Sequence, residues 1–261
     1  MKKRLKFIIT ATVIALIIAI GAIVIHAGAA PDASIVGFNL SFKDSVYITC
    51  AVKFENVPDG AECGILVFEE PRASYTVDTP SHTKITELSH TEDFGDGLCH
   101  VYSYKGISAK EMTKEVYIVA FVNDGGNYTY SEPSKYSVLQ YAYNKLGYSG
   151  VGTPSTDGEF IDLINALLAY GAEAQKYFGE NLSELATDKY YMVVIEGGVL
   201  SDNTDGGLYR AGACITITAP AEKGAVSFSH WVDGEGAILS DMTEFSYTVP
   251  EKNVTITAIY E

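Results

Sequence analysis

Hydrophobic and polar residues alternate with a period of two along much of the chain after residue 31. In residues 46–54 the even positions are apolar, which predicts a half-buried strand with Cys50 on its core face. Residues 64–68 and 116–122 are continuous apolar runs of strand length and predict buried strands. Residues 34–131 are therefore expected to form an antiparallel β-sandwich.

Two stretches without apolar alternation interrupt this strand pattern. Residues 123–126 read Asn-Asp-Gly-Gly, which predicts a tight turn between two antiparallel strands. Residues 72–97 are polar and irregular, so they are expected to form a connection without regular structure.

The apolar spacing then changes to that of a helix. Residues 138–146 lie between Ser137 and Gly147, a start signal and a stop signal, and predict a short helix. A second helix is expected from Thr156 and Glu159, which match a capping box, to Gly179, which suits the position after a helix end. Its predicted apolar stripe comprises Phe160, Ile164, Leu167, Leu168, Gly171, Ala174 and Phe178.

Alternation returns near the C-terminus. Residues 181–188 are interpreted as a linker between residues 31–180 and a small all-β domain at residues 189–261. In residues 213–219 the odd positions are expected to be buried, with Cys214 on the other face, and residues 254–260 alternate in the same way. Trp231 is expected to anchor the core of this domain. The predicted fold class is mainly β: a sandwich with two C-terminal helices, then a small β domain.

The first 29 residues resemble an export signal. A basic head with Lys2, Lys3, Arg4 and Lys6 precedes residues 7–25, which carry no charge. Ala27 and Ala29 then fit a signal peptidase site, so cleavage before Ala30 is predicted. The apolar stretch also approaches the length of a bilayer span, which leaves an uncleaved anchor as the alternative. Both interpretations place the rest of the chain in the envelope or outside the cell.

The net charge of the chain limits the classes of molecule that are expected to bind it. The chain has 18 basic and 33 acidic residues; without the four basic residues of the N-terminal head, 14 basic residues remain and the net charge is −19. Nucleic acids and anionic membranes attract basic surfaces, so neither is expected as a partner. A surface protein or a glycan remains, and contact with a membrane is expected only through an uncleaved N-terminal segment.

Residue patterns that would indicate catalysis or metal binding are missing. Cys50, Cys63, Cys99 and Cys214 match no zinc-binding spacing, although an exported chain could pair them. Cys99 and His100 are neighbours on a predicted strand and point to opposite faces. The acidic pair at residues 69–70 is interpreted as a solvated turn, and the loop at residues 202–206 as a polar turn stabilised by Asx hydrogen bonds. No catalytic residue, metal ligand or cofactor is predicted.

Tyrosines provide the candidate binding residues. Tyr102 and Tyr104 form one alternating pair, and Tyr128 and Tyr130 form another. Each pair places two rings on one face of a strand, where exposed rings could stack on sugars. Tyrosine also favours half-buried strand faces without any ligand, and that interpretation is the simpler one.

Several motifs occur in a characteristic order near the C-terminus. Residues 209–220, the Phe228-Ser229-x-Trp231 motif, residues 245–250 and residues 253–260 follow one another. In this order they resemble the divergent internalin-type B repeat. That family recurs in surface and secreted proteins of Gram-positive and related bacteria, usually in arrays, whereas a single copy is found here.

Residues 31–180 also resemble a module of secreted proteins from anaerobic Gram-positive bacteria, through residues 106–112, 136–138 and 166–178. That resemblance implies a location and no known activity. The sequence therefore predicts an exported, non-catalytic interaction or adhesion protein. A carbohydrate-binding module is the alternative, and a secreted hydrolase is the third possibility.

Overall fold

A computed structural model describes residues 30–42, 45–95 and 97–261. The predicted signal segment at residues 1–29 therefore lies outside the described residues. Residues 31–261 form one compact unit. In the described part of the chain, no helix has both the length and the apolar character needed to cross a membrane.

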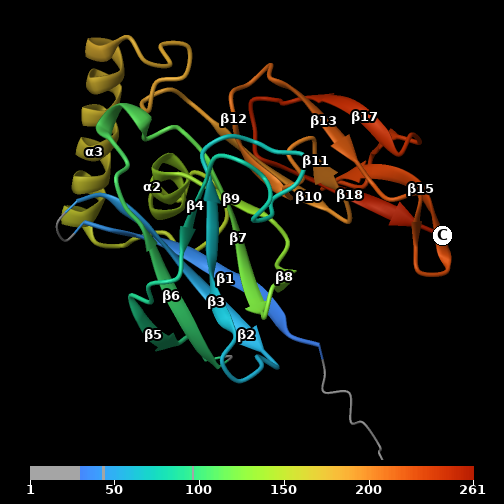
Figure 1. Ribbon diagram of the computed structural model, residues 1–261. Helices are drawn as coiled ribbons and strands as arrows, with labels where there is room; N and C mark the ends of the chain where they lie inside the picture. The colour runs from blue at the N-terminus through green and yellow to red at the C-terminus, as the bar shows by residue number, and fades with distance from the viewer. Residues whose placement is uncertain (1–29, 43–44, 96) are drawn as a thin grey trace, which may run out of the picture. The chain divides into compact units, whose positions relative to one another are not determined.

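Residues 32–136 form the predicted β-sandwich (Figure 1). One sheet has the strand order β1-β2-β6-β5, and the other has the order β4-β3-β7-β8, with β9 also pairing with β7. All neighbouring strands in both sheets are antiparallel. The strands are β1 (Asp32–Ser41), β2 (Tyr47–Glu55), β3 (Glu62–Phe68), β4 (His82–Ile85), β5 (His90–Asp93), β6 (Leu98–Tyr104), β7 (Val116–Asp124), β8 (Asn127–Tyr130) and β9 (Ser134–Tyr136).

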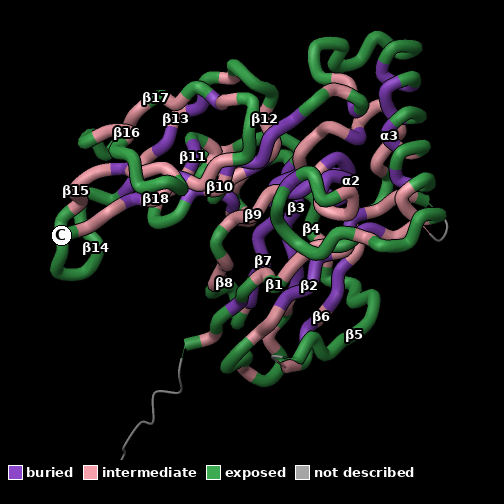
Figure 2. The backbone as a smooth tube through the Cα atoms, turned by 180° about the vertical axis from the view of Figure 1, so that it is seen from behind, coloured by how far each residue is buried: buried purple, intermediate pink, exposed green. Residues whose placement is uncertain are grey.

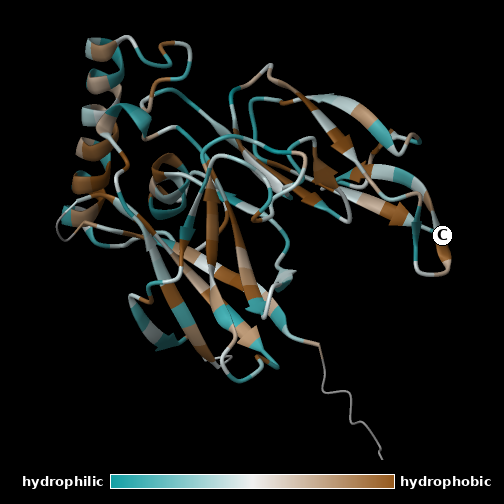
Figure 3. Cartoon of the chain, in the orientation of Figure 1, coloured by the Kyte–Doolittle hydropathy of each residue, from teal (hydrophilic) through white to brown (hydrophobic). Residues whose placement is uncertain are grey.

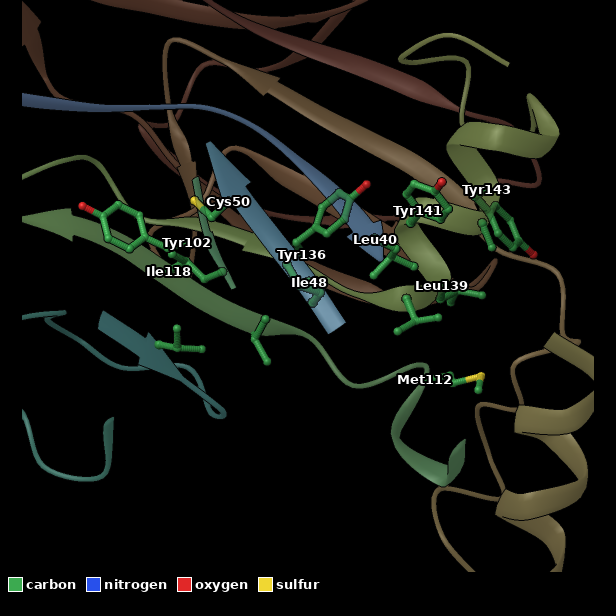
Figure 4. Packing of buried hydrophobic residues seen from close by; sticks show 14 of the residues in the cluster. Leu40, Ile48, Cys50, Tyr102, Met112, Ile118, Tyr136, Leu139, Tyr141 and Tyr143 are labelled. Atoms are coloured by element: carbon green, nitrogen blue, oxygen red, sulfur yellow. The ribbon is translucent and has the colours of Figure 1, made fainter. Parts of the chain in front are cut away.

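The main core fills the space between the two sheets. Ile48, Cys50 and Val52 are buried there, as the alternation of β2 predicts. Figure 4 shows Cys50 and Tyr102 from one sheet near Ile118 from the other. Both faces of β3 and β7 are covered, because their outward residues pack in a second cluster with Tyr75. This double burial explains their continuous apolar runs, which Figure 3 colours largely brown.

Two helices cover one end of the sandwich. Helix α2 (Val138–Leu146) matches the prediction, with the Ser137 side chain accepting from the Gln140 N–H and Gly147 at φ 76°. Helix α3 (Gly158–Phe178) follows, and a short 3-10 turn, η1 (Ala109–Glu111), packs against it. The core extends into this end through Leu139, Tyr141 and Ile164.

Helix α3 departs from the prediction in its N-cap and in the extent of its buried stripe. Asp157, not Thr156, is the N-cap, because its side chain accepts from the N–H groups of Glu159 and Phe160. A carboxylate at this position also interacts favourably with the helix dipole. Phe178 is 64% exposed, so the buried stripe ends one turn earlier than predicted. Gly179 closes the helix at φ 67°, as predicted.

The C-terminal region is built from β strands around its own core. Its larger sheet has the order β12-β10-β18-β15-β14 with β16 pairing with β15, and its smaller sheet has the order β11-β13-β17. Trp231 is fully buried there and donates from Nε1 to the Met242 carbonyl, so its predicted anchoring role is confirmed. The strands are β10 (Tyr191–Glu196), β11 (Val199–Leu200), β12 (Gly206–Tyr209), β13 (Cys214–Thr218), β14 (Glu222–Lys223), β15 (Val226–Asp233), β16 (Ile238–Ser240), β17 (Glu244–Thr248) and β18 (Val254–Tyr260).

Residues 181–188, the predicted linker, make specific contacts. Ala186 is fully buried, and its N–H donates to Gln175 Oε1 at 2.8 Å. Gln175 Nε2 in turn donates to the Glu184 carbonyl at 2.9 Å. The two hydrophobic cores are separate clusters, and the core of the sandwich includes Ala186 of this segment and Tyr190 beyond it. The division into two folding units stays a prediction.

Candidate functional site

A groove of about 1570 Å³ lies along the sheet β1-β2-β6-β5. Thr49 and Ala51 line it, and they alternate along β2 with the core residues Ile48 and Cys50. Since successive side chains on a strand point to opposite faces, the floor of the groove is the face of the sheet that points away from the core. Ser103 of β6 pairs with Thr49 and continues this floor.

The connection between β4 and β5 forms one side of the groove. Residues 83–90 line it, and the Ser89 N–H donates to the Val101 carbonyl at 2.9 Å. The Ser89 and Ser103 hydroxyl oxygens lie 2.7 Å apart. These bonds hold the connection along β6, although residues 72–97 were expected to lack regular structure. The two short strands β4 and β5 correct that expectation.

An ion pair and a tyrosine mark one end of the groove. The Tyr104 hydroxyl donates to Glu69 Oε1 at 2.7 Å, and Lys114 Nζ lies 3.0 Å from Glu69 Oε2. The hydrogen bond from Tyr104 and the contact with Lys114 lower the pKa of Glu69. Burial and the Glu69 carboxylate raise the pKa of Tyr104. Glu69 is exposed at a bend, as the sequence predicts, and its carboxylate is also bound by these two partners.

The four candidate tyrosines occupy three different environments. Tyr102 is 2% exposed and belongs to the core, so its ring is not accessible for stacking on a ligand. Tyr104, at the end of β6, packs against the main core and also lines one end of the groove. Tyr128 and Tyr130 lie on β8, and their rings stack at 5.7 Å between centroids and 9° between planes. The structure does not bring the two pairs together, and a binding role for these residues stays a prediction.

The stacked pair on β8 has local partners. The Tyr130 hydroxyl accepts from the Val77 N–H at 3.1 Å, which ties β8 to the loop over the outer face of its sheet. Lys84 Nζ lies 5.9 Å from the centre of the Tyr128 ring. Both tyrosines are half-buried and pack against the second cluster of the sandwich. Their contacts suit a structural role at this sheet face.

A buried charge cluster lies outside the groove. Lys135 on β9 is only 4% exposed along its side chain, and its Nζ lies 2.8 Å from Asp202 Oδ2 and 3.4 Å from Glu115 Oε2. It also donates to the Tyr209 hydroxyl at 2.8 Å. Gly207 leaves room for this side chain, because an added Cβ would lie 2.6 Å from Lys135 Cε and would displace it. The cluster joins β9 of the sandwich to the C-terminal region.

The charges in this cluster do not balance. One cation faces two carboxylates, so Glu115 is the weaker partner. Burial, together with nearby Asp202, raises the pKa of Glu115 despite the opposing effect of Lys135. Burial opposes the charged form of Lys135, but Glu115 and Asp202 raise its pKa above the ordinary value. Sequence reasoning considered Asp202 only as part of a turn and did not relate it to Glu115 or Lys135, because the three residues are far apart in the chain and form no motif.

The other residues considered for catalysis or metal binding make structural contacts. The Asp202 side chain accepts from the Thr204 N–H at 3.1 Å, and Asn203 has φ 63°, so the turn predicted at residues 202–206 is confirmed. Cys99 is buried with Ala51 and Val101, whereas His100 contacts the Phe54 ring edge-on. Within the described residues, no cluster of three or more His, Cys, Asp or Glu residues could hold a metal ion.

The strand order and core of the C-terminal region define a small β module, and comparison assigns it to a family. Residues 191–261 match the family model described as the divergent InlB B-repeat domain. The resemblance seen in the sequence is thereby confirmed, and the match begins at the first residue of β10. Such domains are typical of surface or secreted proteins. No curated protein and no solved structure matches the chain.

Proposed function

We propose that this chain is an exported, non-catalytic interaction protein of the surface of a Gram-positive bacterium, and that it binds its partner in the groove over β1-β2-β6-β5. The groove carries the proposal, because a large hollow lined by polar and apolar groups on a rigid sheet is a common form of binding site. The match to a B-repeat domain supports a surface location. The basic and apolar N-terminal residues support export.

The sandwich holds the groove in a fixed shape. Each floor residue alternates with a core residue, and Ile48, Cys50 and Tyr102 are each at most 2% exposed. The floor therefore cannot change its position without disturbing the core. The repeat domain at residues 191–261 is expected to present the sandwich at the surface.

Blocking the groove is the direct test. Thr49→Trp places a large side chain on the floor of the groove, at a half-buried strand position that tolerates aromatic residues. Ser227→Trp makes the same change at an exposed position of β15, outside the groove, and serves as the matched control. Flow cytometry then measures how each labelled protein binds to a panel of intact bacterial and animal cells.

We expect wild type and Ser227→Trp to bind the same cells, and Thr49→Trp to lose at least about tenfold in affinity, or about 1.4 kcal/mol. Equal binding by a folded Thr49→Trp protein would show that the groove is not the binding site. If the protein turned over a peptide or polysaccharide, and one carboxylate or cysteine substitution abolished that activity, the proposal that the protein is non-catalytic would be overturned. Recovery of an intact N-terminus in the cytoplasm would overturn export.

A further inference from the structure

The size of the groove indicates what kind of ligand it holds. Its volume of about 1570 Å³ exceeds the roughly 300–1,000 Å³ of sites that enclose a small molecule. Its lining runs from β1 across β2 and β6 to β5, so it crosses the width of the sheet. A segment of a long chain fits this shape better than a single small molecule.

The floor offers side-chain hydrogen-bonding groups rather than backbone groups. Strand β2 is paired with β1 on one side and with β6 on the other, so its backbone is used by the sheet. An extended peptide could not add to this face as a further strand, because strand addition needs a free edge. The side-chain groups on this face are instead hydroxyls and an amide, from Asn39, Thr49 and Ser103. Each already makes one hydrogen bond within the protein, and a hydroxyl or an amide keeps further donor or acceptor capacity beyond one bond. These groups can donate to and accept from ligand hydroxyls.

Exposed apolar side chains line the same groove. Val36, Leu88 and Phe94 are 47%, 42% and 50% exposed. Three large apolar groups exposed in one hollow are more informative than the same residues scattered over a surface. Phe94 and the half-buried Tyr47 supply aromatic rings, which can pack against the apolar faces of sugar rings.

The charges of the groove are mostly paired. Lys84 forms an ion pair with Glu62, and Glu69 is bonded to both Lys114 and Tyr104. His90 Nε2 lies 3.5 Å from Glu92 Oε2. The chain as a whole has 33 acidic and 18 basic residues. A polyanionic ligand would therefore be repelled at long range, and no cluster of unpaired cations is present among the described lining residues to hold it.

We propose that the groove binds a segment of an uncharged polysaccharide. Hydroxyl and amide groups of the floor bond the sugar hydroxyls, while Phe94 and Tyr47 contact the apolar ring faces. This inference rests on the proposed function, since it names the ligand class of the same groove. The open sheet face without a deep pocket favours internal units of the polymer over a chain end.

Affinity gel electrophoresis tests the ligand class. The full chain, kept in a zwitterionic detergent because residues 7–25 are apolar, migrates through gels containing a β-glucan, a mannan, a xylan or the polyanion alginate. At least one neutral polysaccharide is expected to retard wild type and Ser227→Trp, and alginate is not. Thr49→Trp should migrate without retardation. Phe94→Ala should weaken binding at least about tenfold, and the matched exposed substitution Phe178→Ala should leave it unchanged.

Three results would overturn the ligand assignment. Retardation by alginate alone would show a charged ligand. Retardation of a folded Thr49→Trp protein would place the glycan elsewhere. The third result combines two observations: no neutral polysaccharide and no neutral glycan of an array binds, yet Thr49→Trp still removes binding to cells. The groove would then bind another class of ligand, such as a peptide. In that last case the proposed function stands and only the ligand class fails. Thermal melting confirms that each variant is folded.

Discussion

Replacing Lys135 with methionine is the sharpest test of how the sandwich and the C-terminal region are joined. Methionine fills most of the space of the lysine stem but carries no charge. Asp202, Tyr209 and Glu115 would lose their common partner, which lies 2.8, 2.8 and 3.4 Å from them. Asp202 is 13% exposed along its side chain, so water cannot fully replace the ammonium group.

The expected cost follows from this burial. Removing one partner of a buried ion pair costs about 3–5 kcal/mol. For a chain of this size each kcal/mol lowers Tm by about 2–4 °C, so Lys135→Met should lower Tm by about 6–20 °C at neutral pH. The cost should be smaller in mild acid, because Glu115, whose pKa is raised, can then take up a proton.

Calorimetry with three variants measures this cost. Lys252→Met is the control, because Lys252 is 61% exposed and its contact with Glu235 is a surface pair. It should change stability by less than about 0.5 kcal/mol. Adding Asp202→Asn to Lys135→Met should recover part of the loss, because the amide removes the unpaired charge and keeps an acceptor for the Thr204 N–H. A Lys135→Met protein within about 1 kcal/mol of wild type would refute the reasoning.

Three further predictions concern other parts of the fold. Since the pKa of Glu115 is raised above 4.5, the stability that this group contributes is present at low pH and is lost as the pH rises through the raised pKa. Glu115→Gln should abolish that loss in melts recorded over a series that starts below pH 4.5 and rises above it, and an unchanged profile would contradict the raised pKa. Native alkylation followed by intact mass should label exposed Cys214 and spare buried Cys50, whereas two disulfides without a free thiol would refute this expectation. Limited proteolysis should cut first within residues 181–188 and leave two protected fragments. Gln175→Ala should speed this cut, because it removes the hydrogen bonds that hold the segment. One protected fragment that spans the segment would show a shared core.

The strand and helix pattern was predictable because it depends on local spacing. Ile48, Cys50 and Val52 of β2 are buried as the alternation predicts. Ser137 and Gly147 bound α2, where the sequence carries its start and stop signals. Helix α3 shows the limit of such reasoning. Thr156 and Asp157 are both residue types that favour the N-cap position. Asp157 occupies it, because its side chain accepts from the Glu159 N–H.

The candidate site was only partly predictable. Tyrosine alternation identified Tyr104, which lines the groove, but equally identified Tyr102, which is buried. Alternation gives the face on which a residue lies and not what covers that face. The wall at residues 83–90 was missed, because its short strands carry no apolar periodicity and form through pairing with β3 and β6.

The sequence by itself determined the β class, both helices, the turn at residues 123–126 and the B-repeat module, since each depends on periodicity or motif order within a short window. The tertiary structure decided which sheet faces are covered, where the groove lies, and how Lys135 meets Asp202 across 67 residues of chain. Lys135 lies in a polar segment of the sequence, and its neighbours there do not indicate that its side chain is buried. Its environment is set by long-range packing, which brings together charges that no local pattern relates.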